Sequence, residues 1–153
     1  MSGASSRIGA AVRSLAIAMA ALSWLGAAHA QVIVSPSKGS ALRSDILNAL
    51  RPAIAREIGG HVSFVVHTLR VMDRWAYVSA DPVRPDGHPI DWRTTKFRRD
   101  VEADMFSGLM LALLRRSDAG QWAVADYALG PTDVAWVEWI DKHKVPEALF
   151  KSE

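Results

Sequence analysis

The sequence contains no cysteine among its 153 residues. Disulfide bonds are therefore excluded, and so are a thiolate nucleophile and attachment of a lipid to a cysteine. Nucleophilic catalysis would need a serine, and the chain has no Gly-x-Ser-x-Gly turn that would activate one. The absence of cysteine thus removes the simplest covalent mechanisms.

An apolar run long enough to cross a membrane is also lacking. The run over residues 15–28 has 14 residues, whereas a transmembrane helix needs about 20. Arg7 and Arg13 precede it and Ala28-His29-Ala30 follows it, the pattern of a signal peptide cleaved before Gln31. Because the arginines are not adjacent, general secretory export is favoured over the twin-arginine route. We expect a periplasmic or secreted protein with no stable membrane anchor after cleavage.

The predicted mature chain also lacks a net charge. Of 18 Lys and Arg, Arg7 and Arg13 lie in the predicted signal peptide, and the remaining 16 equal the 16 Asp and Glu. A neutral chain has no overall field that would attract it to nucleic acid or anionic lipid. We therefore expect no nucleic-acid partner and leave a small molecule, a cell-wall component or a protein as candidate ligands. The oligomeric state stays open.

Three segments follow from these patterns. Residues 1–30 are the predicted signal peptide, residues 31–39 an extended arm that leads into a turn, and residues 40–153 a single α+β domain. The predicted mature chain, residues 31–153, is long enough to bury a hydrophobic core without disulfide bonds or a structural metal.

The first predicted helix covers residues 42–58 and ends at Gly59-Gly60, with Ser40 or Ser44 as its N-cap. Its apolar residues recur every four positions: Leu42, Ile46, Leu50, Ile54 and Ile58. Pro52 lies inside this pattern, and we expect it to kink the helix or to split it.

Two hairpins are predicted after this helix. Residues 61–71 and 75–80 form the first, and Asp73-Arg74 is a poor turn, so a loop longer than two residues is expected. Residues 105–115 and 121–129 form the second, around a turn at 117–120. Strict alternation places Trp122 and Val124 on one face of the last strand, and Tyr127 and Leu129 on the other.

The remaining segments are less regular. Residues 81–104 are broken by prolines, with a short helix or edge strand expected over 95–104. The last helix starts at a Thr132 or Asp133 cap and ends before Pro146. Its predicted apolar side is Val134, Trp136, Val137, Trp139, Ile140 and His143. After it, we expect Leu149 and Phe150 to dock.

The order helix, hairpin, irregular connection, hairpin, helix predicts an α+β fold. We expect a four-stranded, mostly antiparallel sheet with an N-terminal and a C-terminal helix packed on one face. This order resembles the cystatin-like and nuclear transport factor 2-like group, and the resemblance implies a curved sheet around a helix with a cone-shaped cavity. Short segments also resemble small exported bacterial proteins: Phe64-Val65-Val66, Leu69-Arg70-Val71, Trp75-Ala76-Tyr77 and Gly130-Pro131-Thr132-Asp133-Val134.

Candidate catalytic residues are His67, His88, Asp126 and Asp133. His88 lies between two carboxylates in Pro85-Asp86-Gly87-His88-Pro89-Ile90-Asp91, which would suit acid–base chemistry, although Pro-Asp-Gly is also a good turn. Asp126 could face a ligand or only solvent, and Asp133 could be a helix cap. No two histidines have the spacing of a metal pair, so we expect no metal site and no cofactor.

Aromatic residues are the other candidates. Trp75, Tyr77, Trp122 and Tyr127 either fill the core or line a ligand cavity. A basic stretch, Arg93 to Arg99, is flanked by acids, which favours a solvated surface over a phosphate-binding one.

Two functions fit these observations. The first is an exported binding or interaction module without catalysis. The alternative is a cofactor-free hydrolase or isomerase that uses His67 or His88 with Asp126 or Asp133 in the sheet cavity.

Overall fold

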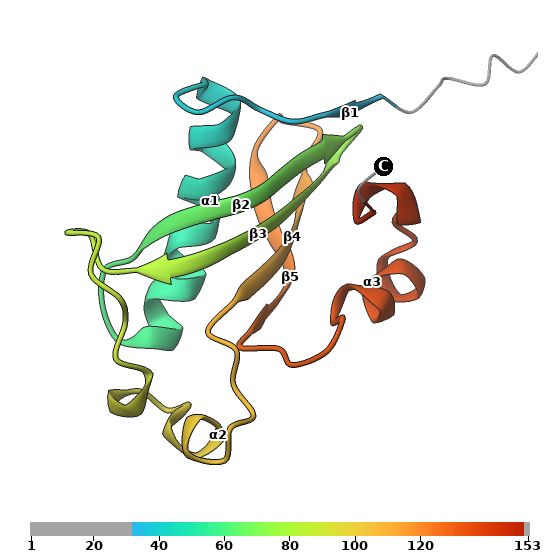
Figure 1. The fold of residues 1–153 in the computed structure, drawn as a ribbon. Coiled ribbons are helices and arrows are strands. Elements are labelled where there is room, and N and C mark those ends of the chain that lie inside the picture. Colours follow the sequence, from blue (N-terminus) through green and yellow to red (C-terminus); the bar gives the residue numbers. More distant parts are fainter. Residues whose placement is uncertain (1–31, 152–153) are drawn as a thin grey trace, which may run out of the picture.

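A five-stranded antiparallel sheet is the centre of the molecule, with its strands in chain order from β1 to β5 (Figure 1). The computed structural model describes residues 32–151, so the predicted signal peptide of residues 1–30 lies outside the described residues. The elements are β1 (Ile33–Val34), α1 (Ala41–Ile58), β2 (Ser63–Met72), β3 (Trp75–Val83), η1 (Trp92–Thr94), α2 (Arg98–Glu102), β4 (Met110–Arg116), β5 (Trp122–Leu129), α3 (Trp136–His143) and η2 (Glu147–Leu149). None of the helices in this range has the length and apolar character to cross a bilayer.

The predicted α+β class is confirmed, but the sheet has five strands rather than four. The additional strand is β1, which belongs to the predicted extended arm. Ile33 pairs with Met72 and Val34 with Val71, both antiparallel. A strand of two residues is held by backbone hydrogen bonds and is too short to show a periodic pattern of side chains. The sequence pattern therefore did not predict β1.

Helix α1 is one continuous helix. The Oγ of Ser40 accepts a hydrogen bond from the backbone N–H of Arg43 (3.3 Å), and Gly59 ends the helix with φ 67°. The expected split at Pro52 is wrong. Pro52 is exposed, so the carbonyl of Asn48, which loses its helical donor, can be solvated.

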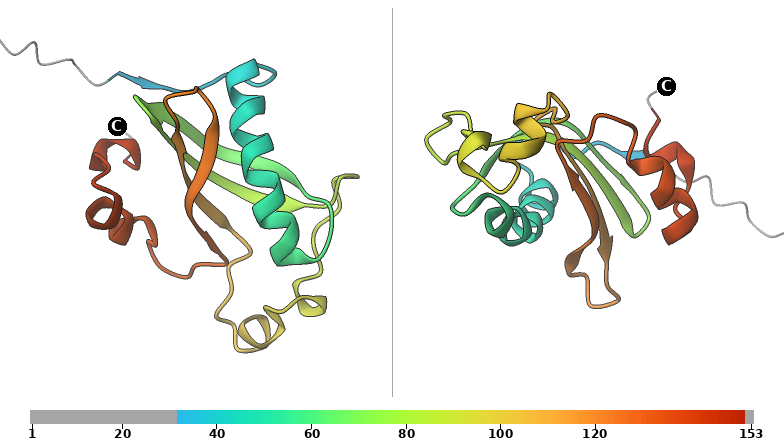
Figure 2. Two further views of the ribbon diagram at one scale, coloured as in Figure 1. Left: turned by 180° about the vertical axis from the view of Figure 1, so that it is seen from behind. Right: turned by 90° about the horizontal axis from the view of Figure 1, so that it is seen from below.

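The two long helices cover opposite faces of the sheet, which corrects the prediction that both lie on one face (Figure 2). Ile46, Leu50 and Ile54 of α1 pack with alternate residues of β3 and β4. On the other face, Trp139 of α3 packs with Leu149 and the remaining set of alternate residues. Met110 to Leu114 are all buried, because both faces of β4 are covered.

Strand β5 contains a bulge that reverses one predicted alternation. Leu113 pairs with Asp126 and Leu114 with Val124, so Ala125 has no partner across the ladder. This extra residue brings the four large side chains of β5 to the α1 face: Trp122, Val124, Tyr127 and Leu129. The prediction that Tyr127 and Leu129 lie opposite Trp122 is therefore wrong, and Asp126 lies on the α3 face.

The first hairpin has a two-residue turn, since Met72 pairs directly with Trp75. The expected longer loop is wrong. Asp73 adopts φ 51°, a region that aspartate tolerates better than most residues. A second register shift occurs between Val66 and Thr68, so His67 lies at an irregularity of β2.

The connection from β3 to β4 includes the short helix α2, within the predicted range 95–104. The rings of Trp92, Phe97 and Phe106, all in this connection, pack together with centroids 4.8–5.9 Å apart. Backbone of Gly130, at the end of β5, lies directly against the Phe106 ring.

The C-terminal segment packs on the α3 face. Leu149 and Phe150 are buried, as expected. Neither predicted residue caps α3, whose N-cap position is Ala135, and the Asp133 carboxylate instead accepts from the backbone N–H of Val134. Val134 and Val137, predicted on the apolar side, are exposed. Val134 precedes the helix, and Val137 lies to the side of the packed stripe that Trp136, Trp139 and Ile140 form.

Candidate functional site

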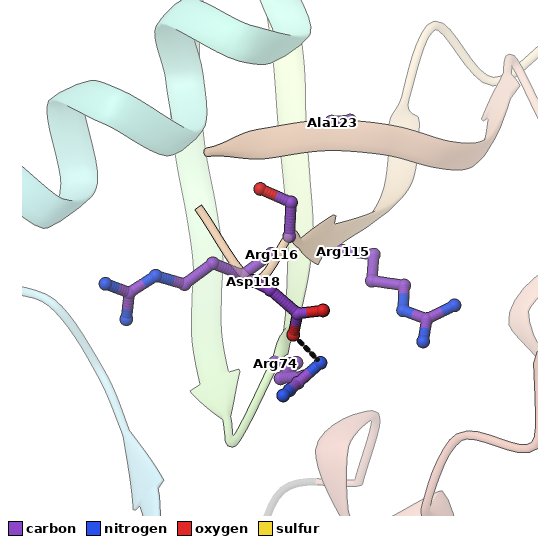
Figure 3. A pocket seen from close by; sticks show the side chains of 6 residues that line it. Arg74, Arg115, Arg116, Asp118 and Ala123 are labelled. Carbon is purple, nitrogen blue, oxygen red and sulfur yellow. Dashed lines mark ion pairs between the residues drawn. The ribbon is translucent and has the colours of Figure 1, made fainter. Parts of the chain in front are cut away.

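A pocket of about 350 Å³ lies at the end of the sheet where the two hairpin turns meet (Figure 3). The β2–β3 turn contributes Arg74 and the end of the second hairpin contributes the rest. The backbone N–H of Arg116 donates to the carbonyl of Arg74 (2.7 Å), which holds the turns together. We call this site the arginine pocket; its lining residues are Arg74, Arg115, Arg116, Ser117, Asp118 and Ala123.

Each guanidinium of the arginine pocket has its own contact. Arg74 Nη1 lies 2.5 Å from Asp118 Oδ1. The Arg115 guanidinium lies over the Trp75 ring, 5.4 Å from its centroid. Arg116 Nε donates to the carbonyl of Gly120 (3.3 Å). Arg115 and Arg116 point to opposite sides of the Arg74–Asp118 pair (Figure 3).

Three arginines and one aspartate line the arginine pocket, so the summed charge of its lining residues is positive. Asp118 is 86% exposed and Arg74 59% exposed, so their ion pair is open to water. Exposed ion pairs contribute only about 0–1 kcal/mol to stability. The pair is therefore weak enough for a competing anion to displace.

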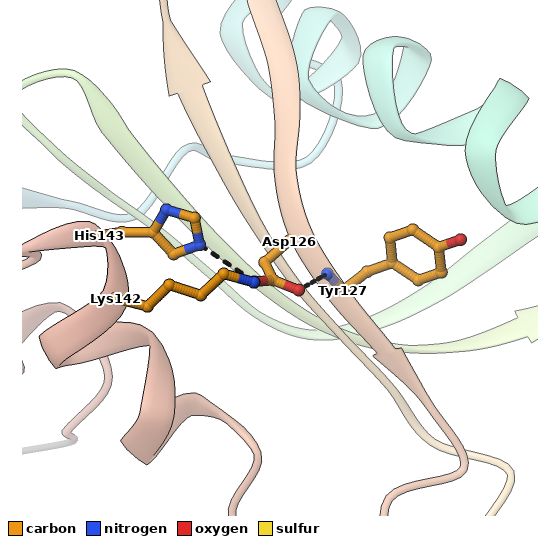
Figure 4. A network of polar contacts seen from close by, with 4 residues as sticks. All are labelled: Asp126, Tyr127, Lys142 and His143. Carbon is orange, nitrogen blue, oxygen red and sulfur yellow. Dashed lines mark hydrogen bonds and ion pairs between the residues drawn. The ribbon is translucent and has the colours of Figure 1, made fainter.

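A second polar cluster joins β5 to α3 (Figure 4). Asp126 Oδ2 accepts a hydrogen bond from Lys142 Nζ (2.7 Å) and lies 3.0 Å from His143 Nε2. Its other oxygen, Oδ1, accepts from the backbone N–H of Tyr127 (3.0 Å). Asp126 and His143 are only 20% and 18% exposed, so the cluster is largely sheltered by the packing of α3 on the sheet.

The electrostatics of Asp126 reflect two opposing causes. Burial disfavours the charged carboxylate, but the hydrogen bonds from Lys142 and His143 together outweigh it, so the pKa of Asp126 lies below its ordinary value. The ionised carboxylate is the state that fits this cluster. Because both oxygens already have partners, the cluster resembles a clamp between α3 and the sheet more than an open catalytic base.

A third cluster lies on the α1 face. The Tyr127 hydroxyl donates to Glu57 Oε1 (2.7 Å), and Lys96 forms an ion pair with the same carboxylate. The hydrogen bonds from Lys96 and Tyr127 lower the pKa of Glu57, and the hydrogen bond to Glu57 raises the pKa of Tyr127. Sequence spacing gives no sign of this cluster, because its members come from α1, the β3–β4 connection and β5.

The predicted catalytic residues are dispersed. His67 Nε2 lies 2.8 Å from Asp81 Oδ2, and both side chains are about half exposed. His88 is exposed, and its backbone N–H donates to Asp86 (3.0 Å), which closes the Pro-Asp-Gly turn. The imidazole beside Asp126 is that of His143. Asp133 Oδ1 accepts a hydrogen bond from the backbone N–H of Val134 (2.7 Å).

The four predicted ligand-binding aromatics divide between the two faces. Trp75 and Tyr77 lie on the α3 face and Trp122 and Tyr127 on the α1 face. Tyr77 is buried against the Phe150 ring (5.1 Å), and this burial raises its pKa. Two of the four adjoin the arginine pocket: Trp75 through its contact with Arg115, and Trp122, which pairs with Arg116 and precedes Ala123.

Two other sequence features contribute little to a site. In the basic stretch, Lys96 pairs with Glu57 and Arg98 with Glu102 (2.7 Å), consistent with a solvated surface. Ser35 and Lys38 have the Ser-x-x-Lys spacing, so the expectation that the chain holds no such motif is wrong. Both are exposed in the irregular segment before α1, and no hydrogen bond joins their side chains in the described structure.

Among residues 32–151, no group of three or more His, Asp or Glu side chains is placed to hold a metal ion. The arginine pocket was missed by the sequence interpretation because Arg74 and Arg115 are far apart in the chain. The sequence holds one sign of this pocket: arginines lie at the ends of both predicted hairpins, Arg74 in the first and Arg115 and Arg116 in the second. Comparison with protein-family models, with curated proteins and with solved structures gives no match for this chain.

Proposed function

We propose that the protein is an exported, non-catalytic binding module that takes an acidic ligand in the arginine pocket. One observation carries the proposal: three arginines line a single pocket together with one exposed aspartate. Arginine suits this role because its planar fork of N–H donors matches the oxygens of a carboxylate or phosphate.

The framework around the pocket supports a binding role. The walls belong to strand ends and tight turns joined by backbone hydrogen bonds, including Arg116 N–H to Arg74 and Ser117 N–H to Gln121 (2.8 Å). Arg115 is also oriented by the face of Trp75. Groups held in place before binding lose less entropy when a ligand arrives, so even a small anion can be bound.

Export is the second part of the proposal, and it rests on the pattern of residues 1–30. Mass spectrometry of the protein from the periplasm of its host should give a mature chain that starts at Gln31. A chain that retains Met1 and stays in the cytosol would contradict export without affecting the proposed site.

Binding can be tested by titrating the mature protein with a tetraglutamate peptide and with inorganic phosphate, using tryptophan fluorescence and calorimetry. We expect saturable binding that weakens as salt rises, because exposed charges are screened within about 8 Å at physiological ionic strength. Arg115→Gln should weaken it by up to about fivefold, the equivalent of losing one exposed charge contact of about 1 kcal/mol. Arg99→Gln, an exposed arginine on α2, is the matched control and should bind like the wild type.

Two results would reject the binding module: no saturable binding of either probe, or equal losses in Arg115→Gln and Arg99→Gln. The second result would indicate a nonspecific effect of net charge.

The alternative function, a cofactor-free hydrolase or isomerase, is favoured by one observation. His67 and Asp81 lie 2.8 Å apart, and Asp81 also lines a pocket of about 290 Å³ that includes the Ser107 side chain. Hydrolysis of a model ester that is lost in His67→Ala and kept in His61→Ala would support this alternative over a binding module.

A further inference from the structure

We propose that Asp118 occupies the place of the ligand's acidic group. The ligand then binds through an oxyanion, either a carboxylate or a phosphate group, that displaces Asp118 from Arg74. This inference rests on the proposed function, since it concerns the same pocket. It assigns the ligand class from the group that the protein itself places there. It also makes Asp118 a built-in competitor that sets the affinity of the site.

The geometry of the turn allows the carboxylate to leave. Residues 117–120 are closed by hydrogen bonds from Gly120 N–H to the Ser117 carbonyl (2.9 Å) and from Gln121 N–H to Ser117 Oγ (3.1 Å). None of these bonds uses the Asp118 side chain. The carboxylate can therefore rotate away from Arg74 into solvent without opening the hairpin.

The contact between Asp118 and Arg74 has the form of ligand recognition. Asp118 Oδ1 lies 2.5 Å from Arg74 Nη1, a short, charge-assisted contact between a carboxylate and a guanidinium. At 86% exposure, Asp118 gains nothing from packing, so its position is set by this contact and by the turn. An incoming oxyanion finds the same donor in the same orientation.

A second arginine of the pocket has a contact that does not involve Asp118. Arg115 is oriented by Trp75 rather than by Asp118, so displacement of Asp118 leaves Arg115 in place. Ala123, another lining residue, has only a methyl group as its side chain and takes up little of the pocket. Phosphate, with its higher charge, and a peptide of adjacent carboxylates should therefore bind better than acetate, which has a single charge.

The test compares Asp118→Asn with the wild type, using inorganic phosphate, tetraglutamate and acetate as probes. We expect Asp118→Asn to bind phosphate or tetraglutamate about two- to fivefold more tightly, because no internal carboxylate competes. Asp45→Asn, at an exposed aspartate of α1 that does not line the pocket, removes the same charge and should leave affinity unchanged. Arg74→Gln in the Asp118→Asn background should abolish the gain.

The outcomes separate this inference from the proposed function. A gain for phosphate alone identifies a phosphate-bearing ligand, a gain for tetraglutamate alone identifies an acidic peptide, and either supports displacement. Unchanged or weaker binding in Asp118→Asn, while Arg115→Gln still lowers affinity, overturns the inference and leaves the binding module standing. An equal gain in Asp45→Asn also overturns it, because net charge would then explain the result.

Discussion

The hydroxyl of Tyr127 donates a 2.7 Å hydrogen bond to Glu57, which joins β5 to α1. The preceding residue, Asp126, accepts from Lys142 and lies beside His143 on α3. Two consecutive residues of one strand thus connect the sheet to helices on opposite faces. They lie immediately after the unpaired Ala125, so the bulge decides which face each side chain takes.

Tyr127→Phe should lower the free energy of unfolding by about 1–3 kcal/mol, because Glu57 loses a neutral donor while it is held away from bulk water. Urea unfolding at neutral pH measures the loss. In a double-mutant cycle, Tyr127→Phe and Glu57→Ala should be non-additive, since both remove the same contact. Strictly additive losses would show that the hydrogen bond does not stabilise the fold.

Asp126→Asn should lower stability in a pH-dependent way. The pKa of Asp126 in the folded protein lies below its ordinary value of 3.8, so its stabilisation is present above that value and is lost as pH falls through the folded pKa. The difference in unfolding free energy between wild type and Asp126→Asn should be largest near pH 6 and shrink below 3.8. Urea unfolding over this range measures it.

The matched control for this titration is Asp133→Asn, an exposed aspartate whose carboxylate serves only a local turn. At pH 6 it should lose less stability than Asp126→Asn, because its carboxylate does not join two elements of the fold. If the Asp126→Asn difference instead grew as the solution became more acidic, the direction of the pKa shift would be contradicted.

Gly130→Ala should destabilise the protein far more than Gly39→Ala. Both glycines have positive φ, 66° and 85°, so alanine costs about 1 kcal/mol of backbone strain at either position. A Cβ at Gly130 would also overlap the Phe106 ring, whereas one at Gly39 meets open space. Overpacking adds roughly 1–3 kcal/mol at Gly130. Equal melting temperatures for the two variants would show that the Phe106 ring moves aside freely.

Local patterns in the sequence were enough to predict most elements. Apolar residues every four positions and Gly59 predicted α1, and both predicted hairpins are present in the sheet. The faces of β5 were wrong, because one unpaired alanine shifts all later residues by one position and alanine does not signal a bulge.

Sequence alone determined the α+β class, the two hairpins, the first helix and the absence of cysteine chemistry, because periodicity and composition act between near neighbours. The tertiary structure decided that α1 and α3 cover opposite faces, that the arm adds a fifth strand, and that Arg74 meets Arg115, Arg116 and Asp118. These features depend on contacts between distant segments, and free energy of packing over the whole chain selects them. The candidate site therefore became visible only when the ends of two hairpins were brought together.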